Sequence, residues 1–385
     1  MTAVIAVLHA EDVALEFISV LREHADRDVR VLIGQAGASV NLPGGLSLRE
    51  RLELLAPAVE PGGNTADLPT PDEVAALLGE SPGEVWTHSP ADHRIRRARF
   101  GWTVSRAVPS LPVTYSVGDN PFLQTVPGKA VAVTGAEAEA KIDFINRRAG
   151  ELLRSRVADR LVTTDRVPAV ERFFIADAAR ANRLYALISS LGEDAAVADD
   201  PWEFGRSAYE SARLDATAAW VARWCSPQDG PLVEVGACEG ELTRRLAGKG
   251  YRVQATEPNP RFRARLTERF PLGPEGGVEV LAESLEDLAA RRERPAAAYL
   301  LIEMLYYDQE PALLDDLPTD LVLVALESGQ LNERVWPWLR GQSTWRVAER
   351  VELAPPTLEP VCDGLAYLRK RGSRGLVLAR AGRAG

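Results

Sequence analysis

The sequence predicts an α/β protein that contains two Rossmann-like three-layer domains. Short apolar runs typical of buried parallel strands alternate with segments of helical spacing along most of the chain. The length of 385 residues is sufficient for two domains of ordinary size, and the hydrophobic content of 46% is sufficient for two cores. We place the domains at residues 1–180 and 201–385, with a linker at 181–200, because small and acidic residues gather before Pro201.

Composition limits the function classes. The formal charge of −10, with both signs interspersed, argues against a non-specific binder of nucleic acid or of a membrane surface and favours a small polar substrate. The first apolar run lacks a basic leader and is broken by His9, Glu11 and Asp12, so we expect neither a signal peptide nor a membrane span. Three widely spaced cysteines, an odd number, indicate a reducing, cytoplasmic setting without disulfides.

The clearest motif is a glycine-rich turn between a buried strand at 232–235 and a helix that starts at 242. A second strand, 252–256, stops at Glu257. Such a unit binds a nucleotide-like ligand at its strand ends, where missing Cβ atoms admit the ligand and the acid can hold a ribose diol. The turn, E-V-G-A-C-E-G, departs from the dinucleotide pattern G-x-G-x-x-G. An ordinary α/β turn with incidental glycines is the alternative.

The same turn resembles motif I of the class I methyltransferases that use S-adenosylmethionine (SAM). The resemblance implies a seven-stranded sheet, with the remaining strands at 278–281, 298–302, 321–326, 343–353 and 364–379. It implies SAM as cofactor, and it places a polar side chain after the third strand against the adenine amine. The implied cofactor-binding residues are Glu234, Gly236, Ala237, Gly240, Glu257, Glu283 and Ser284.

The fourth strand runs into Glu303-Met304-Leu305-Tyr306-Tyr307, at the position where a methyl acceptor meets the cofactor. A carboxylate such as Glu303 can orient an ammonium group and accept its proton. The alternative is that Glu303 only caps the segment that follows. This segment and the stretch DPWEFGRSAYESARLDATAAW resemble NodS-like methyltransferases, which methylate amino groups on sugars. Glu303 and Tyr306 are therefore our catalytic candidates in the second domain.

Polar residues also follow two predicted strands of the first domain. His9-Ala10-Glu11-Asp12 follows the strand at 2–8, and His88 to His93 follows the strand at 84–87. Two imidazoles and a carboxylate from these segments can hold zinc with one position open for water. Histidines that are only hydrogen-bonded in loops are the alternative.

The order of these elements resembles the PIG-L/LmbE family of zinc-dependent N-deacetylases over residues 1–180. The resemblance implies His9, Asp12 and His93 as zinc ligands and Glu11 as the base that activates the zinc-bound water. Two departures matter. Glu11 replaces an aspartate, and Pro90 replaces the histidine that polarises the substrate carbonyl, so the ligand set is intact while the acid partner is absent.

Together the resemblances predict a bifunctional enzyme of amino-sugar metabolism, in which zinc-dependent N-deacetylation frees an amine that SAM-dependent N-methylation then modifies. A second hypothesis is a methyltransferase alone, with an inactive deacetylase-like domain for substrate binding or dimerisation. A third is a non-catalytic metal-binding scaffold with a vestigial cofactor fold. The expected partner is a small amino-sugar substrate, without nucleic acid or membrane. Homo-oligomerisation, the acceptor's identity and N versus O methylation stay open.

Overall fold

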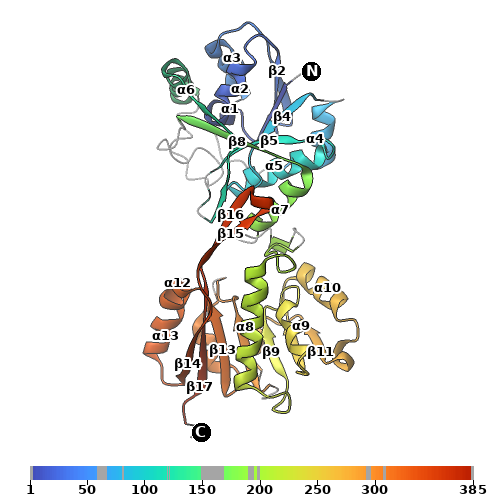
Figure 1. Ribbon diagram of the computed structural model, residues 1–385, viewed down its shortest axis with the longest axis vertical. Coiled ribbons are helices and arrows are strands. Elements are labelled where there is room, and N and C mark those ends of the chain that lie inside the picture. Colours follow the sequence, from blue (N-terminus) through green and yellow to red (C-terminus); the bar gives the residue numbers. More distant parts are fainter. Residues whose placement is uncertain are drawn as a thin grey trace. The chain divides into compact units, whose positions relative to one another are not determined.

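A computed structural model describes most of the chain. The described residues are 3–58, 67–79, 82–118, 120, 122–148, 169–189, 195–196, 200–291, 296–306 and 309–382. The chain divides into two compact units (Figure 1). The first unit is Met1–Pro201 together with Pro360–Leu368, and the second is Trp202–Glu359 together with Arg369–Gly385.

The first unit is built around a seven-stranded mixed sheet with the order β3-β2-β1-β4-β5-β8-β7. Strands β1, β2, β4 and β5 are parallel, whereas the pairs β2–β3, β5–β8 and β7–β8 are antiparallel. The strands are β1 (Ala3–Val7), β2 (Val29–Ile33), β3 (Ala38–Leu42), β4 (Glu84–Thr87), β5 (Val113–Ser116), β7 (Lys129–Ala132) and β8 (Val170–Ala176).

Helices cover both faces of this sheet, which gives the expected three layers (Figure 1). One apolar cluster contains residues of α1 (Glu11–Glu16), α2 (Ile18–Glu23), α3 (Leu48–Leu55) and α6 (Gly135–Arg148). The other contains residues of α4 (Pro71–Leu78), α5 (Ile95–Ala107) and α7 (Ala178–Ser189). Residues 181–189, which we expected in a linker, therefore belong to a helix whose apolar face is buried in the first unit.

A small three-stranded sheet has the order β15-β16-β6. Strand β6 (Leu123–Thr125) pairs antiparallel with β16 (Ala366–Lys370), which follows β15 (Thr357–Val361) along the chain. Val361, Cys362 and Ala366 are buried in the same apolar cluster as α4, α5 and α7. A segment from late in the sequence thus completes the core of the first unit.

The second unit has a seven-stranded sheet with the order β11-β10-β9-β12-β13-β17-β14. The first five are parallel, and β17 lies antiparallel between β13 and β14. The predicted last strand, 364–379, is in fact two strands, because the chain turns at Gly372 with a φ of 84°. The strands are β9 (Leu232–Val235), β10 (Val253–Thr256), β11 (Val278–Leu281), β12 (Ala298–Ile302), β13 (Leu321–Leu326), β14 (Trp345–Ala354) and β17 (Ser373–Arg380).

This sheet also has an apolar cluster on each face. One cluster includes residues of α8 (Ala208–Trp224), α9 (Glu241–Ala247) and α10 (Pro260–Arg269). The other includes residues of α11 (Leu285–Ala289), the π-helical turn Leu331–Val335 and α13 (Trp336–Gly341), which follow α12 (Ser328–Gln330). Strands β9 and β12 are neighbours in the sheet. The strands that follow β9 in the chain, β10 and β11, lie on one side of this pair, and the strand that follows β12, β13, lies on the other side. Ligands of open α/β sheets bind at such a switch point, beyond the carboxyl ends of the strands.

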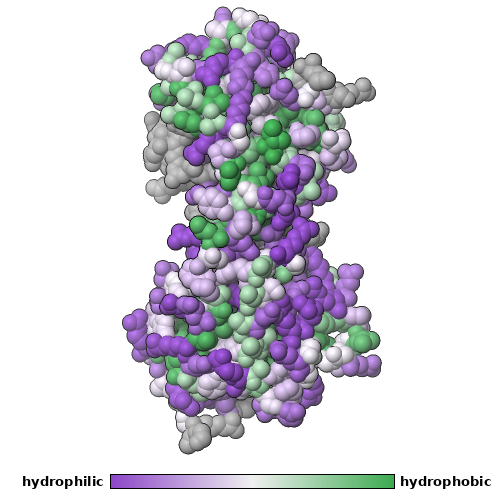
Figure 2. Space-filling model, in the orientation of Figure 1, coloured by the Kyte–Doolittle hydropathy of each residue, from purple (hydrophilic) through white to green (hydrophobic). Residues whose placement is uncertain are grey.

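Hydrophilic and hydrophobic residues are interspersed on the visible face of each unit (Figure 2). Among the described residues, no helix combines the length and the apolar character that a membrane crossing requires.

Candidate functional site

The glycine-rich turn after β9 has a backbone that only small or strained residues can adopt. Gly236, Cys238 and Gly240 have φ angles of 69°, 52° and 78°. A Cβ atom on Gly240 would lie 2.5 Å from Leu266 Cδ1, so glycine is required there for space as well as conformation. Cys238 is a non-glycine residue in this left-handed region, a form of strain that is common at functional sites.

Glu257 lies beside this turn, as predicted. One carboxylate oxygen accepts a hydrogen bond from the Cys238 N–H at 2.9 Å, and the other accepts one from the Asn259 N–H at 2.9 Å. Burial raises the pKa of Glu257, although the two N–H donors partly offset this effect. A carboxylate offers about four acceptor positions, so the side chain can still accept hydrogen bonds from two hydroxyl groups of a ligand.

Glu234 and Ala237 are placed differently from Glu257. The Glu234 carboxyl lies under the turn, where it accepts a hydrogen bond from the Thr243 hydroxyl on α9 at 2.6 Å. Burial raises its pKa to about 7. Ala237 is buried and donates its N–H to the Thr256 carbonyl. Both residues therefore hold β9, β10 and α9 together, and their predicted contact with the cofactor remains a prediction.

Glu283 and Ser284 follow β11, as expected, but both have other partners. Glu283 forms an ion pair with Arg291, whose Nε lies 2.9 Å from it. Ser284 is the N-cap of α11 and forms a reciprocal capping box with Asp287. The adenine contact remains a prediction for both, and the use of the Ser284 hydroxyl as a cap makes Glu283 the stronger candidate.

Glu303 follows β12 with a φ of 53°, which is strained for a residue with a Cβ. One of its carboxylate oxygens accepts a hydrogen bond from Tyr306 and the other accepts one from the Ser373 hydroxyl. Burial raises the pKa of Glu303, and this effect exceeds the opposing influence of Arg213 and the two hydroxyl donors. The structure thus brings together the two predicted acceptor-side residues. Tyr307 lies outside the described residues.

Arg213 is a site residue that the sequence analysis did not single out. Its guanidinium is buried on α8, with Nε 2.8 Å from Glu210 and Nη1 3.9 Å from Glu303. Nη1 makes no hydrogen bond with the described residues. The sequence does contain a sign of this role. Arg213 lies among small residues in the buried part of AYESARLDATAAW, and an arginine is rarely buried unless it has a charged partner.

The predicted zinc ligands are not assembled in the first unit. Asp12 is fully buried, and its carboxylate pairs with Arg97 and with the His88 ring at 3.1 Å, while the His9 N–H also donates to it. The His93 side chain is 48% exposed and lies beside Asp92. Among the described residues, no group of three or more histidine, cysteine or carboxylate side chains is arranged to hold a metal. Because a guanidinium and an imidazole occupy the Asp12 carboxylate, these residues do not fit a zinc site.

Glu11 is buried close to Asp12, at the start of α1. Its predicted role was to activate a zinc-bound water, so without a zinc site that role has no support. The structure instead places a cluster of charged side chains at this sheet edge.

In this buried charge cluster, three carboxylates face two guanidinium groups and the His88 ring. Glu16 links these groups: it lies 3.1 Å from the His88 ring, 2.8 Å from Arg97 and 3.2 Å from Arg94, and it accepts a hydrogen bond from Ser116. Burial lowers the pKa of His88, but the adjacent carboxylates raise it more, so the net shift is upward. The Leu8 N–H donates a hydrogen bond to Nε2 of the ring at 3.0 Å. The members of the buried charge cluster are Asp12, Glu16, His88, Asp92, Arg94 and Arg97.

Comparisons with known proteins find solved methyltransferase structures that are similar to about half of this chain. No protein-family model matches the sequence, and no curated protein matches it. Magnesium protoporphyrin IX methyltransferase from Synechocystis PCC 6803, solved with bound SAM, is similar at 14% identity and a TM-score of 0.36, covering 49% of this chain and 89% of that chain. The methyltransferase domain of bacterial CtHen1 is similar at 14% identity and a TM-score of 0.34, and the match covers 44% of this chain and 98% of that chain. At such values, similarity does not by itself define an activity.

Proposed function

We propose that the second unit is a SAM-dependent methyltransferase. The observation that carries the proposal is the position of the Glu257 carboxylate, which is bonded to the glycine-rich turn and keeps free acceptor positions at the switch point of the sheet. The turn supplies backbone without obstructing side chains, and the acid supplies a partner for a ribose diol. Arg213 adds a buried cationic donor for the cofactor's carboxylate.

We further propose that the acceptor is an amine, in an amino sugar. The cofactor supplies an electrophilic methyl group on a sulfonium with a neutral leaving group, so the protein's main task is alignment in a dry site. Glu303, whose pKa is raised by burial, is suited to accept the proton of an ammonium group. Tyr306 and Ser373 fix the orientation of its carboxylate. The resemblance of this segment to NodS-like enzymes supports the sugar amine.

For the first unit we propose no hydrolysis. The carboxylate expected to bind zinc is paired with Arg97 and in contact with the His88 ring, so deacetylation has no supporting geometry. We assign this unit the role of the second hypothesis, a module for substrate binding or dimerisation.

Replacement of Glu257 by alanine tests the cofactor assignment. The substitution should weaken SAM binding about 5- to 150-fold, or about 1–3 kcal/mol, because ribose hydroxyls lose their acceptor in a buried site. Isothermal titration calorimetry measures the affinity directly. Glu268→Ala on the exposed face of α10 is the matched control and should bind as the wild type does. Equal affinities for the wild type and Glu257→Ala, with the thermal unfolding of both checked, would remove the ribose assignment.

A further inference from the structure

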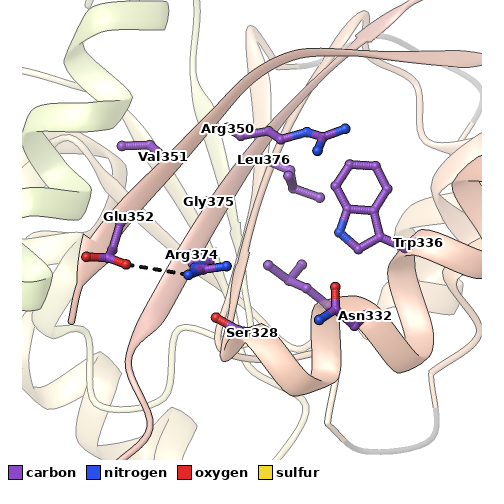
Figure 3. Close-up of a pocket in the computed structure, with 10 residues that line it drawn as sticks. Ser328, Asn332, Trp336, Arg350, Val351, Glu352, Arg374, Gly375 and Leu376 are labelled. Carbon is purple, nitrogen blue, oxygen red and sulfur yellow. Dashed lines mark ion pairs between the residues drawn. The ribbon is translucent and has the colours of Figure 1, made fainter. Parts of the chain in front are cut away.

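A cavity of about 360 Å³ lies at the carboxyl edge of the second unit's sheet, away from the glycine-rich turn. Strands β14 and β17 form one wall, and the segment from α12 to α13 forms the other (Figure 3). Figure 3 shows polar side chains from all of these elements around the opening. The residues that matter here are Ser328, Asn332, Trp336, Arg350, Arg374 and Leu376.

The cavity carries an excess of positive charge in a protein with a net charge of −10. The Arg350 guanidinium lies 4.1 Å from the centre of the Trp336 ring, which holds it by a cation–π contact. Arg374 lies 3.7 Å from Glu352, at the limit of an ion pair. The cavity lining therefore contains two guanidinium groups, both solvent-exposed, and one carboxylate.

These groups define the class of ligand. Arginine presents planar pairs of N–H donors that match the oxygens of phosphate and carboxylate groups. The Asn332 amide and the Ser328 hydroxyl add uncharged donors, while Leu376 gives the cavity an apolar wall. The volume is within the range of small-molecule sites. An oxyanion attached to a small organic molecule fits this combination.

The cavity adjoins the acceptor side of the proposed active site along the chain. Ser328 follows Glu327, whose N–H donates to the Tyr306 hydroxyl at 3.2 Å. Arg374 follows Ser373, whose hydroxyl donates to Glu303; because neighbouring strand residues point to opposite faces, the two side chains lie on opposite faces of the sheet at the same edge. All of these residues lie at the carboxyl edge of the parallel strands, where ligands of open sheets bind. We propose that the cavity binds the anionic group, a phosphate or a carboxylate, of the methyl acceptor.

Anion binding is tested on the full chain by calorimetric titration with inorganic phosphate and, separately, with acetate at constant ionic strength. At least one anion should bind saturably to the wild type, and the one that binds identifies the group. Arg350→Gln and Arg374→Gln should each weaken this binding at least tenfold. Arg346→Gln, an exposed position on the same strand as Arg350, should not change it. Absence of saturable binding to the wild type, or wild-type affinity in both cavity variants, would overturn the proposal.

The link to the acceptor, which rests on the proposed function, needs a kinetic measurement. In a panel of amines offered with and without a phosphate or carboxylate, the anionic members should have the higher kcat/KM. Arg350→Gln and Arg374→Gln should remove this preference while SAM affinity stays within twofold of the wild type. Equal turnover of the paired amines would overturn the acceptor assignment. Failure of the wild type to bind SAM, with phosphate binding intact, would instead overturn the proposed methyltransferase.

Discussion

Arg97→Met is expected to destabilise the first unit by about 3–5 kcal/mol, the usual cost of removing one partner from a buried charge pair. Arg97 is fully buried and contacts both Asp12 and Glu16. Methionine fills a similar volume without the charge, so the two carboxylates would keep their burial and lose a cation. Equilibrium urea unfolding at pH 7 measures the difference.

The control for this effect is Arg99→Met, two residues along the same helix at an exposed position, which should change stability by less than about 0.5 kcal/mol. The double variant Asp12→Asn with Arg97→Met should recover part of the loss, because it removes a negative charge together with the positive one. If Arg97→Met were as stable as the wild type, the ion pairs of Arg97 with Asp12 and Glu16 would not stabilise the first unit.

Glu234→Gln is expected to stabilise the second unit at alkaline pH. Burial raises the pKa of Glu234 from 4.5 to about 7, so the folded state binds this proton more tightly than the unfolded chain does. Stability from this group is therefore fully present below pH 4.5 and is lost as the pH rises through about 7. This pKa shift of about two and a half units corresponds to about 3 kcal/mol in the free energy of unfolding. Glutamine does not ionise and still offers a carbonyl to the Thr243 hydroxyl.

The measurement is urea unfolding of both proteins at pH 5 and pH 8. The stability of Glu234→Gln relative to wild type should rise by about 2–3 kcal/mol between these two values. Any cost of burying the glutamine amide is equal at the two pH values, so the change in relative stability between them reports only the ionisation of Glu234. Glu268→Gln, at an exposed position, should show no such change. A relative stability independent of pH would mean that Glu234 is not protonated in the folded protein near neutrality.

The sequence was informative where the determinants are local. The glycine-rich turn needs left-handed backbone at Gly236 and Gly240, and an acid at the end of the next strand falls beside it, so the position of Glu257 followed from spacing. Glu303 and Tyr306, which were predicted as acceptor-side residues because they lie in one short segment after the fourth strand, are joined by a hydrogen bond in the structure.

Spacing does not specify which distant side chain neutralises a buried charge, and the zinc prediction was unsupported for that reason. Asp12 has the position of a metal ligand, but its partner Arg97 comes from a helix 85 residues later. Arg213 was overlooked for the same reason, since its proximity to Glu303 depends on how α8 packs on the face of the sheet. The alternation of apolar residues through 364–379 likewise concealed the break at Gly372.

The segment Pro360–Leu368 also bears on how this protein can be divided. The backbone passes between the two units three times, at residues 201–202, 359–360 and 368–369. A gene fragment that ends at residue 201 would lack Val361, Cys362 and Ala366, each of which is buried in the first unit's core. A fragment that starts at residue 202 would expose the same side chains to water, at a cost of roughly 0.8 kcal/mol for each buried methylene-sized group. The two halves are therefore not separable modules, and exchange of either one between proteins by recombination at a single breakpoint would leave both products incomplete.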